Sequence, residues 1–330
     1  MNKFKKSAII FFILGMGLFI LSSCATLAPQ RAPMIFKSDE YIIYELQKEE
    51  TPEILAERFL GDREKSWMIE DFNEKINFKS GEIIVIPLKE RNIGGVTTKG
   101  FQVVPILSYH RFSEKCDNLL CVPTHIFDKQ MNYLKTNGYR GISLKELLDF
   151  VNYRHPLPRK SVVITVDDGY QSVYDIAYPI LKKYGFTASL FIYTDFIGIS
   201  DNAITWDQLR KLKNEGFEIG AHTVSHCDLT KRRKGENDQA YTSRIEKELL
   251  VSKNIIDKEL RQNTIFLAFP YGRYNTDILS ICEKLNYKLG VSVERGSNPF
   301  FADPLALKRN QMLKRDMETF ISRLKTFEEF

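Results

Sequence analysis

Hydrophobic and polar positions change their spacing several times along the 330-residue chain. The first change is an unbroken apolar run over residues 8–21, which follows three lysines and no acidic residue. This run is shorter than the roughly 20 residues that a membrane-spanning helix needs, and it is typical of the apolar core of a secretion signal. The start of the chain is therefore expected to direct export.

The apolar run ends in the sequence Leu-Ser-Ser-Cys, in which the cysteine is Cys24. Small residues before a cysteine resemble the lipobox of bacterial lipoproteins. That resemblance implies a signal peptide over residues 1–23, a lipid anchor on Cys24 that attaches the chain to a membrane, and a place in the bacterial cell envelope. An ordinary signal peptide or an uncleaved anchor is the alternative. Residues 24–38 are then expected to form a tether.

The pattern over residues 39–90 predicts a small module. Short β-type runs indicate strands at 41–44 and 83–87. Between them, helical spacing indicates one helix that begins after the cap residue Thr51 and a second helix over 66–72. The predicted order is therefore strand, helix, helix, strand.

This βααβ order resembles a LysM module. The resemblance rests on residues in both halves of the segment: Thr51, Ile54, Ala56, Phe59, Asn73, Gly81, Ile84, Ile86 and Pro87. LysM modules bind glycans that contain N-acetylglucosamine, so the resemblance implies glycan binding by residues 39–90. A spacer domain without affinity for sugars is the alternative. Residues 91–100, with two adjacent glycines, are expected to form a linker.

Beyond the linker, strand and helix signals alternate over residues 101–330. Seven apolar runs predict short buried strands, at 103–109, 162–166, 188–193, 217–220, 265–269, 288–292 and 305–308. Helical patterns lie between them, and one opens with the capping-box pair Ser143 and Glu146. This alternation predicts an α/β fold, either a parallel barrel or a doubly wound sheet, with its chemistry at the carboxyl ends of the strands.

Charged and imidazole side chains do follow two of these strands. Asp167 and Asp168 come directly after one strand, and two adjacent carboxylates are costly unless a cation is bound. His222 and His226 follow another strand at a spacing that lets both rings reach one metal. Two histidines and one carboxylate leave a position open for water, which predicts a catalytic metal site. Iron in an oxygenase is the alternative occupant.

Three segments resemble the motifs of the polysaccharide deacetylases, the NodB-homology enzymes of carbohydrate esterase family 4. They are TVDDG at 165–169, HTVSH at 222–226 and FPYG at 269–272. The resemblance implies a distorted (β/α)7 barrel. It also implies hydrolysis of acetyl groups on sugars, usually N-acetyl groups of N-acetylglucosamine.

The same resemblance implies roles for individual residues. Asp168, His222 and His226 would hold a divalent metal, with Zn²⁺ as the expected ion, and Asp167 would be the general base. The backbone N–H of Tyr271 would donate to the oxyanion that forms during hydrolysis.

Two positions depart from the family pattern. The third motif usually begins with an arginine that orients the catalytic aspartate, whereas this chain has Ala268 there. The fifth motif usually supplies a late histidine, whereas this chain has Leu313-Lys314-Arg315 and no histidine after His226. The usual orienting group and the usual general acid are therefore both missing.

Two residues are candidates to fill these gaps. His110 follows the first strand at the expected barrel mouth, and we expect it to act as general acid or to orient substrate; a histidine that only braces the metal loop is the alternative. Arg309 follows the last predicted strand and is the candidate for the orienting role lost at Ala268. A solvated loop arginine is the alternative for Arg309, and Arg273 is its competitor.

The departures also resemble the branch that deacetylates poly-β-1,6-N-acetylglucosamine, whereas the LysM-like segment points to peptidoglycan. Both polymers contain N-acetylglucosamine, so the expected reaction is the same for each. A catalytically inactive glycan-binding lipoprotein of the envelope is the alternative function.

Charge refines this domain division. The chain has 47 Lys and Arg against 42 Asp and Glu, a net charge of +5 that is too weak to indicate a nucleic-acid partner. Residues 39–90 hold 7 basic and 14 acidic side chains, whereas residues 91–330 hold 35 basic and 28 acidic ones. The pattern is that of an acidic module attached to a basic domain.

The chain has five cysteines, and the expected export would place the four that follow Cys24 in an oxidising compartment. Cys116 and Cys121 are close enough in sequence to bridge a loop, although sequence alone leaves their pairing open. Cys227 and Cys282 are expected to remain unpaired.

Overall fold

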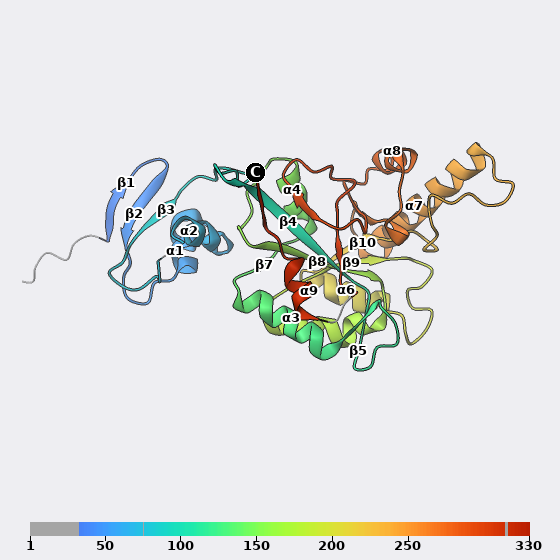
Figure 1. Ribbon diagram of the computed structural model, residues 1–330, viewed down its shortest axis with the longest axis horizontal. Helices are drawn as coiled ribbons and strands as arrows, with labels where there is room; N and C mark the ends of the chain where they lie inside the picture. Colours follow the sequence, from blue (N-terminus) through green and yellow to red (C-terminus); the bar gives the residue numbers. More distant parts are fainter. Residues whose placement is uncertain (1–32, 75, 314–315) are drawn as a thin grey trace, which may run out of the picture.

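The computed structural model describes residues 33–74, 76–313 and 316–330. The predicted signal peptide, Cys24 and the first part of the predicted tether lie outside these residues. Figure 1 shows a small N-terminal module (blue) beside a larger α/β domain. Within the described part of the chain, no helix has both the length and the apolar character needed to cross a membrane.

The module contains the expected strand–helix–helix–strand series, with one additional strand at its start. Its elements are β1 (Met34–Lys37), β2 (Tyr41–Glu45), α1 (Pro52–Leu60), the 3₁₀ turn η1 (Arg63–Lys65), α2 (Ser66–Phe72) and β3 (Ile83–Pro87). The Thr51 side chain caps α1 by accepting a hydrogen bond from the N–H of Ile54. The tether was expected to continue to residue 38, and this is wrong at its end, because β1 pairs antiparallel with β2.

The module has an apolar core of its own. Strands β2 and β3 bury every second residue, so one face of the three-stranded sheet packs against the two helices. The buried residues are Ile42, Tyr44, Leu46, Leu55, Ala56, Ile69, Ile84 and Ile86. Because these side chains contact one another, the module is a separate packing unit.

The large domain alternates strands and helices as expected. Its elements are β4 (Gly100–Tyr109), β5 (Arg111–Ser113), β6 (Cys121–Pro123), α3 (Thr124–Thr136), β7 (Arg140–Gly141), α4 (Leu144–Val151), β8 (Ser161–Asp168), the π-helical turn η2 (Val173–Ala177), α5 (Tyr178–Tyr184), β9 (Ser189–Ile192), α6 (Trp206–Asn214), β10 (Glu218–Ala221), α7 (Asp238–Leu260), β11 (Phe266–Ala268), the 3₁₀ turn η3 (Pro270–Gly272), α8 (Thr276–Lys284), β12 (Leu289–Val291), β13 (Ser297–Pro299), β14 (Asn310–Gln311), α9 (Met317–Ser322) and β15 (Phe327–Glu329).

Six parallel strands form most of the barrel, in the order β12-β11-β10-β9-β8-β4. The seventh position is split: Leu307 bridges Val291 of β12, and β14 pairs with β4. The predicted continuous strand at 305–308 is therefore wrong. The side chain of Asn298 bonds both the N–H and the C=O of Lys308, so these groups are not available to a neighbouring strand.

Alternation along β8 decides which side chains enter the barrel. Val162, Ile164 and Val166 pack outward in the core beneath the helices, whereas Val163 packs in the barrel interior. By the same period of two, Asp167 points to the interior side at the carboxyl end of the strand.

The module contacts the barrel near the amino ends of the strands. Glu70 pairs with Arg140 at 2.6 Å, Glu90 pairs with His155 at 2.8 Å, and Glu74 pairs with Arg159. In Figure 1, β4 runs from the module side of the barrel toward β5. The carboxyl ends of the strands therefore open away from the module.

Candidate active site

A buried ion pair lies at the carboxyl end of β8. The two terminal guanidinium nitrogens of Arg309, Nη1 and Nη2, donate to Oδ1 and Oδ2 of Asp167, each at 2.7 Å, and the Arg309 side chain is fully buried. Its Nε donates to the carbonyl of Ser292 at 2.8 Å. Burial on its own would raise the pKa of Asp167, but the charge and hydrogen bonds of Arg309 outweigh it and lower the pKa to about 2. Asp167 is therefore a fixed carboxylate.

Three side chains from two strand ends converge beside this pair. The Nε2 atoms of His222 and His226 lie 3.7 and 3.4 Å from Oδ1 of Asp168, and one potential ligand atom from each residue lies within 4.8 Å of the others. These are the three residues expected to bind a metal, and the structure brings them together.

The hydrogen bonds of this cluster suit a divalent metal. The Nδ1–H of His222 donates to the carbonyl of Ala268 at 2.7 Å, which leaves the Nε2 lone pair free. Among the described residues, Oδ1 of Asp168 is buried and has no hydrogen-bond donor. Burial and the neighbouring Asp167 charge raise the pKa of Asp168 to about 7, and burial lowers that of His222 to about 3. A buried carboxylate oxygen and two imidazole nitrogens form a donor set that suits a divalent metal, whose charge would favour the ionised form of Asp168.

The loop from residue 222 to 226 is fixed by two further side chains. The hydroxyl of Thr223 accepts from the N–H of His226 at 3.0 Å, which fixes the turn between the two histidines. Glu248 on α7 accepts from the N–H groups of Val224 and Ser225 and from the Ser225 hydroxyl, at 2.8 to 3.1 Å. The histidine loop is thus held from within and from the helix behind it.

Backbone strain concentrates at the same place. In the described chain, ten non-glycine residues have positive φ, and four of them belong to this site: Asp168, Thr223, His226 and Tyr271. Left-handed backbone costs about 1–2 kcal/mol at an ordinary residue, so the surrounding packing must compensate for it. Such compensated strain is typical of functional sites.

Tyr271 lies on the turn that carries the third motif. Its ring contacts the His226 ring edge-on, with centroids 4.9 Å apart, and more than half of the side chain is exposed. Gly272 follows with φ of +69°, and a side chain there would overlap Val293. The glycine therefore lets the turn pack closely, which places Tyr271 beside the metal cluster.

His110 lies between β4 and β5 at the same barrel mouth. Its Nε2 is 3.9 Å from Oδ2 of Asp167, and only 11% of its side chain is exposed. Burial lowers its pKa, and the Asp167 charge partly opposes that shift. The structure therefore brings His110 to the candidate base, as its position in sequence suggested, and its role stays a prediction.

The competitor for the orienting role lies elsewhere. Arg273 pairs with Asp228 at 2.5 Å, and its side chain is exposed. Arg309 is thus the arginine that contacts Asp167. Hollows elsewhere contain none of these groups: one of about 900 Å³ lies at the amino ends of the strands, and one of about 510 Å³ lies between module and barrel.

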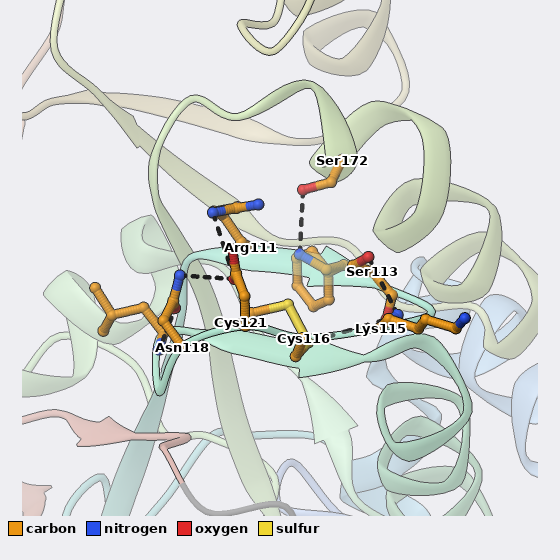
Figure 2. Close-up of a disulfide and its surroundings, with 10 residues drawn as sticks. Arg111, Ser113, Lys115, Cys116, Asn118, Cys121 and Ser172 are labelled. Atoms are coloured by element: carbon orange, nitrogen blue, oxygen red, sulfur yellow. Dashed lines mark hydrogen bonds and ion pairs between the residues drawn. A yellow bond between two sulfur atoms is a disulfide. The ribbon is translucent and has the colours of Figure 1, made fainter.

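A disulfide closes the loop that follows His110. Cys116 and Cys121 are bonded, which resolves the pairing that the sequence left open, and Figure 2 shows the bond between β5 and β6. The Phe112 N–H donates to the Ser172 hydroxyl at 3.1 Å, linking this loop to the turn after β8. Cys227 and Cys282 are unpaired in the part of the chain that is described, as expected.

Comparison with known proteins agrees with this geometry. Residues 154–290 match the family model described as polysaccharide deacetylase. YxkH of Bacillus subtilis, which bears the family name, is 36% identical over 194 residues, or 59% of this chain and 66% of its own. A Staphylococcus aureus poly-β-1,6-N-acetyl-D-glucosamine N-deacetylase is 32% identical over 173 residues, or 51% of this chain and 59% of its own. The matches thus span less than two thirds of either relative.

A solved structure extends the likeness over a whole chain. The Streptococcus pyogenes deacetylase PplD, in complex with acetate, is 31% identical and superimposes with a TM-score of 0.61. The match covers 68% of this chain and 98% of that one. This chain belongs to the polysaccharide deacetylase family. The family membership expected from the three motifs is therefore confirmed.

A second structure supports the fold of the deacetylase domain. IcaB from Ammonifex degensii superimposes with a TM-score of 0.60 at 22% identity, over 68% of this chain and 96% of that one. At this identity the likeness shows the fold alone. It agrees with the barrel expected from the sequence.

Sequence reasoning missed Glu248, although the sequence carried a signal. Along α7 the buried face includes Tyr241, Ile245, Leu249 and Ile256, and Glu248 is an acid on that same face. A charge inside an apolar stripe usually has a buried partner, which here is the histidine loop. The partly exposed rings Tyr193, Phe196 and Tyr170 beside the site had no such signal.

Proposed function

We propose that this chain is a metal-dependent hydrolase that removes N-acetyl groups from N-acetylglucosamine units of a cell-envelope or extracellular polysaccharide. The carrying observation is the cluster of Asp168, His222 and His226 beside an Asp167 carboxylate fixed by Arg309. When bound by the cluster, a divalent metal such as Zn²⁺ lowers the pKa of a bound water and polarises a carbonyl.

Asp167 is the proposed general base. Its low pKa keeps it ionised at neutral pH, and Arg309 fixes its orientation through two bonds. Each carboxylate oxygen has a second lone pair, so a proton from the attacking water can still be accepted. Arg309 is a positioning residue in this proposal. It takes the role of the arginine that the family pattern has at the position of Ala268.

Two further groups are proposed to act on the scissile amide. The backbone N–H of Tyr271 donates to the oxyanion, and His110 donates a proton to the leaving amine or orients the sugar. The position of His110 at the barrel mouth, 3.9 Å from Asp167, supports this role. If His110→Ala keeps a near-normal kcat while Asp167→Asn abolishes turnover, the acid role is wrong.

The proposed polymer is poly-β-1,6-N-acetylglucosamine, with peptidoglycan as the second candidate. The Staphylococcus aureus relative, named for the first polymer, supports it. The resemblance of residues 39–90 to LysM modules supports the second. An export signal over residues 1–23 and a lipid anchor on Cys24 would place the enzyme at the membrane of the cell envelope, near either polymer.

Acetate release by the zinc-loaded protein tests this proposal. We expect release from β-1,6-linked N-acetylglucosamine oligomers to exceed release from peptidoglycan, with stoichiometric zinc by elemental analysis. His222→Ala is expected to lose both zinc and activity, whereas the surface variant His125→Ala should retain both.

Two outcomes would contradict the proposal. Zinc binding without acetate release from any of these polymers would favour the alternative, a catalytically inactive glycan-binding lipoprotein of the envelope. Oxygen-dependent turnover with bound iron would indicate oxygenase chemistry instead.

A further inference from the structure

A continuous series of ring contacts leads away from the metal cluster. The ring of His226 contacts that of Tyr193 at 5.2 Å between centroids, and Tyr193 stacks on Phe196 at 5.2 Å. Phe196 contacts Tyr170 edge-on at 5.2 Å, and the Arg111 guanidinium lies over the Tyr170 ring at 5.4 Å. We call Tyr193, Phe196, Tyr170 and Arg111 the aromatic strip.

The aromatic strip crosses neighbouring strand ends in the order of the sheet. His226 follows β10, Tyr193 follows β9, Tyr170 follows β8 and Arg111 follows β4, and these strands are neighbours in that order. The strip therefore runs across the carboxyl face of the barrel, where a substrate must approach. All four of its side chains are partly exposed to solvent.

Backbone bonds hold the middle of the strip in place. The N–H of Ile204 donates to the carbonyl of Gly169 at 3.0 Å, and the N–H of Gln171 donates to the carbonyl of Asn202 at 2.8 Å. These bonds tie the loop after β9, which carries Phe196, to the turn that carries Tyr170. The strip is thus pre-formed, which reduces the entropy lost on binding.

The disulfide loop fixes the far end. The N–H of Arg111 donates to the carbonyl of Leu120 at 3.1 Å, and Arg111 is in register with Cys121 in the β5–β6 pair. Figure 2 shows Arg111 beside the Cys116–Cys121 bond, with Ser172 on the facing turn. A side chain held at its backbone on a covalently closed loop is suited to form one end of a binding site.

We propose that the aromatic strip binds the sugar units of the polysaccharide that adjoin the reacting N-acetylglucosamine, on the β4 side of the metal cluster. This inference rests on the proposed deacetylase function. Pyranose rings present C–H groups that suit the electron-rich faces of aromatic rings. Arg111 offers several N–H donors to the hydroxyl or acetyl oxygens of a sugar at the far end.

Packing in the core would place these rings differently. Fully buried aromatic residues such as Phe127 and Phe191 lie beneath the helices or inside the barrel. The members of the strip are instead partly exposed, and the series begins beside the proposed metal ligand His226. A row of aromatic rings that starts at the reacting group is what a linear polymer needs.

Chain-length dependence tests the strip. We expect Tyr170→Ala to raise KM for a hexamer of β-linked N-acetylglucosamine by roughly tenfold, which corresponds to the loss of one aromatic contact. We expect kcat on the hexamer and both constants on the dimer to stay near wild type. Arg111→Gln should act in the same direction with a smaller effect and little risk to folding.

Tyr153→Ala is the matched control, because Tyr153 is an exposed aromatic residue that packs on Phe300, outside the strip. Its kinetics should equal wild type on both oligomers. An equal loss on dimer and hexamer in the strip variants, or no loss on either, would overturn the proposal.

A binding measurement separates this proposal from the proposed activity. Calorimetric titration of the hexamer into Asp167→Asn protein should show affinity about tenfold weaker when Tyr170→Ala is added. Failure of wild type to release acetate would refute the activity alone, since the titration still tests the strip. Equal affinities with and without Tyr170→Ala would refute the strip.

Discussion

The N-terminal module and the barrel mouth use opposite means to reach a defined structure. The core cluster of the module contains eight buried apolar residues, and the Glu70–Arg140 pair that joins the module to the barrel is about one third exposed on both sides. The barrel mouth buries charges, leaves a carboxylate oxygen without a donor from any described residue and holds four non-glycine residues at positive φ. Buried charge and strained backbone destabilise a fold, so the packing around the barrel mouth must compensate for them. Such exceptions are expected where function resides.

Asp167→Asn, at the barrel mouth, should cause the largest loss of activity. The amide cannot accept a proton as the carboxylate does, so kcat for acetate release should fall about 1,000-fold or more. Zinc content and the circular dichroism of the folded protein should change little, because Asp167 is outside the proposed ligand set, whereas the unpaired buried charge of Arg309 should lower the unfolding free energy by about 3–5 kcal/mol. Asp175→Asn, at an exposed position, is the control, and a loss of similar size there would contradict the assignment.

Arg309→Met should harm both stability and turnover. The variant leaves the buried Asp167 without its partner, so unfolding free energy should fall by about 3–5 kcal/mol and kcat by about 100-fold. Arg273→Met removes a surface arginine instead and should cost less than about 1 kcal/mol.

The stability loss in Arg309→Met should depend on pH. In the wild type the pKa of Asp167 is about 2 against an ordinary 3.8, so the ion pair stabilises the fold above about pH 4 and this is lost as pH falls toward 2. Without Arg309, burial raises that pKa, and the variant loses stability as pH rises. Denaturant midpoints should therefore differ more at pH 7 than at pH 3, and a constant difference would contradict the coupling.

Leu55→Ala should destabilise the module and leave the barrel mouth unaffected. Leu55 is fully buried in the module core, and removal of its side chain should cost about 2–5 kcal/mol locally. We expect hydrogen exchange to increase across residues 41–87 while kcat on a short oligomer stays unchanged. Ile54→Ala, at an exposed neighbour, is the control; a large fall in kcat would show that the regions are not independent.

Glu70→Gln should have the smallest effect. The Glu70–Arg140 pair joins the module to the barrel, but both side chains are about one third exposed. Such pairs contribute up to about 1 kcal/mol, and salt weakens them. The thermal midpoint should fall by a few degrees at low salt and by less at high salt, as scanning calorimetry would show.

The sequence predicted the strands and the metal cluster because both rest on local pattern. Apolar periodicity located six barrel strands, and the spacing of His222 and His226 after a strand end predicted their convergence with Asp168. The missing arginine at Ala268 pointed to Arg309, although only the fold could bring it to Asp167, because the two residues lie far apart in the chain.

Features built by loops and by distant partners were not predictable. The aromatic strip depends on turns after three different strands, and the support from Glu248 depends on how α7 packs behind the histidine loop. The split seventh strand depends on the Asn298 side chain, which takes the backbone bonds of Lys308. In the last two cases a side chain from a distant segment, Glu248 or Asn298, fixes the backbone of another segment.

The position of Arg309 also makes the geometry at Asp167 depend on the last segment of the barrel. Asp167 lies near the middle of the chain, and its partner arrives only when the last barrel segment docks between β12 and β4. Until then Asp167 lacks the charge that holds its carboxylate ionised and oriented. The orientation of the proposed base therefore depends on the last barrel segment being in place.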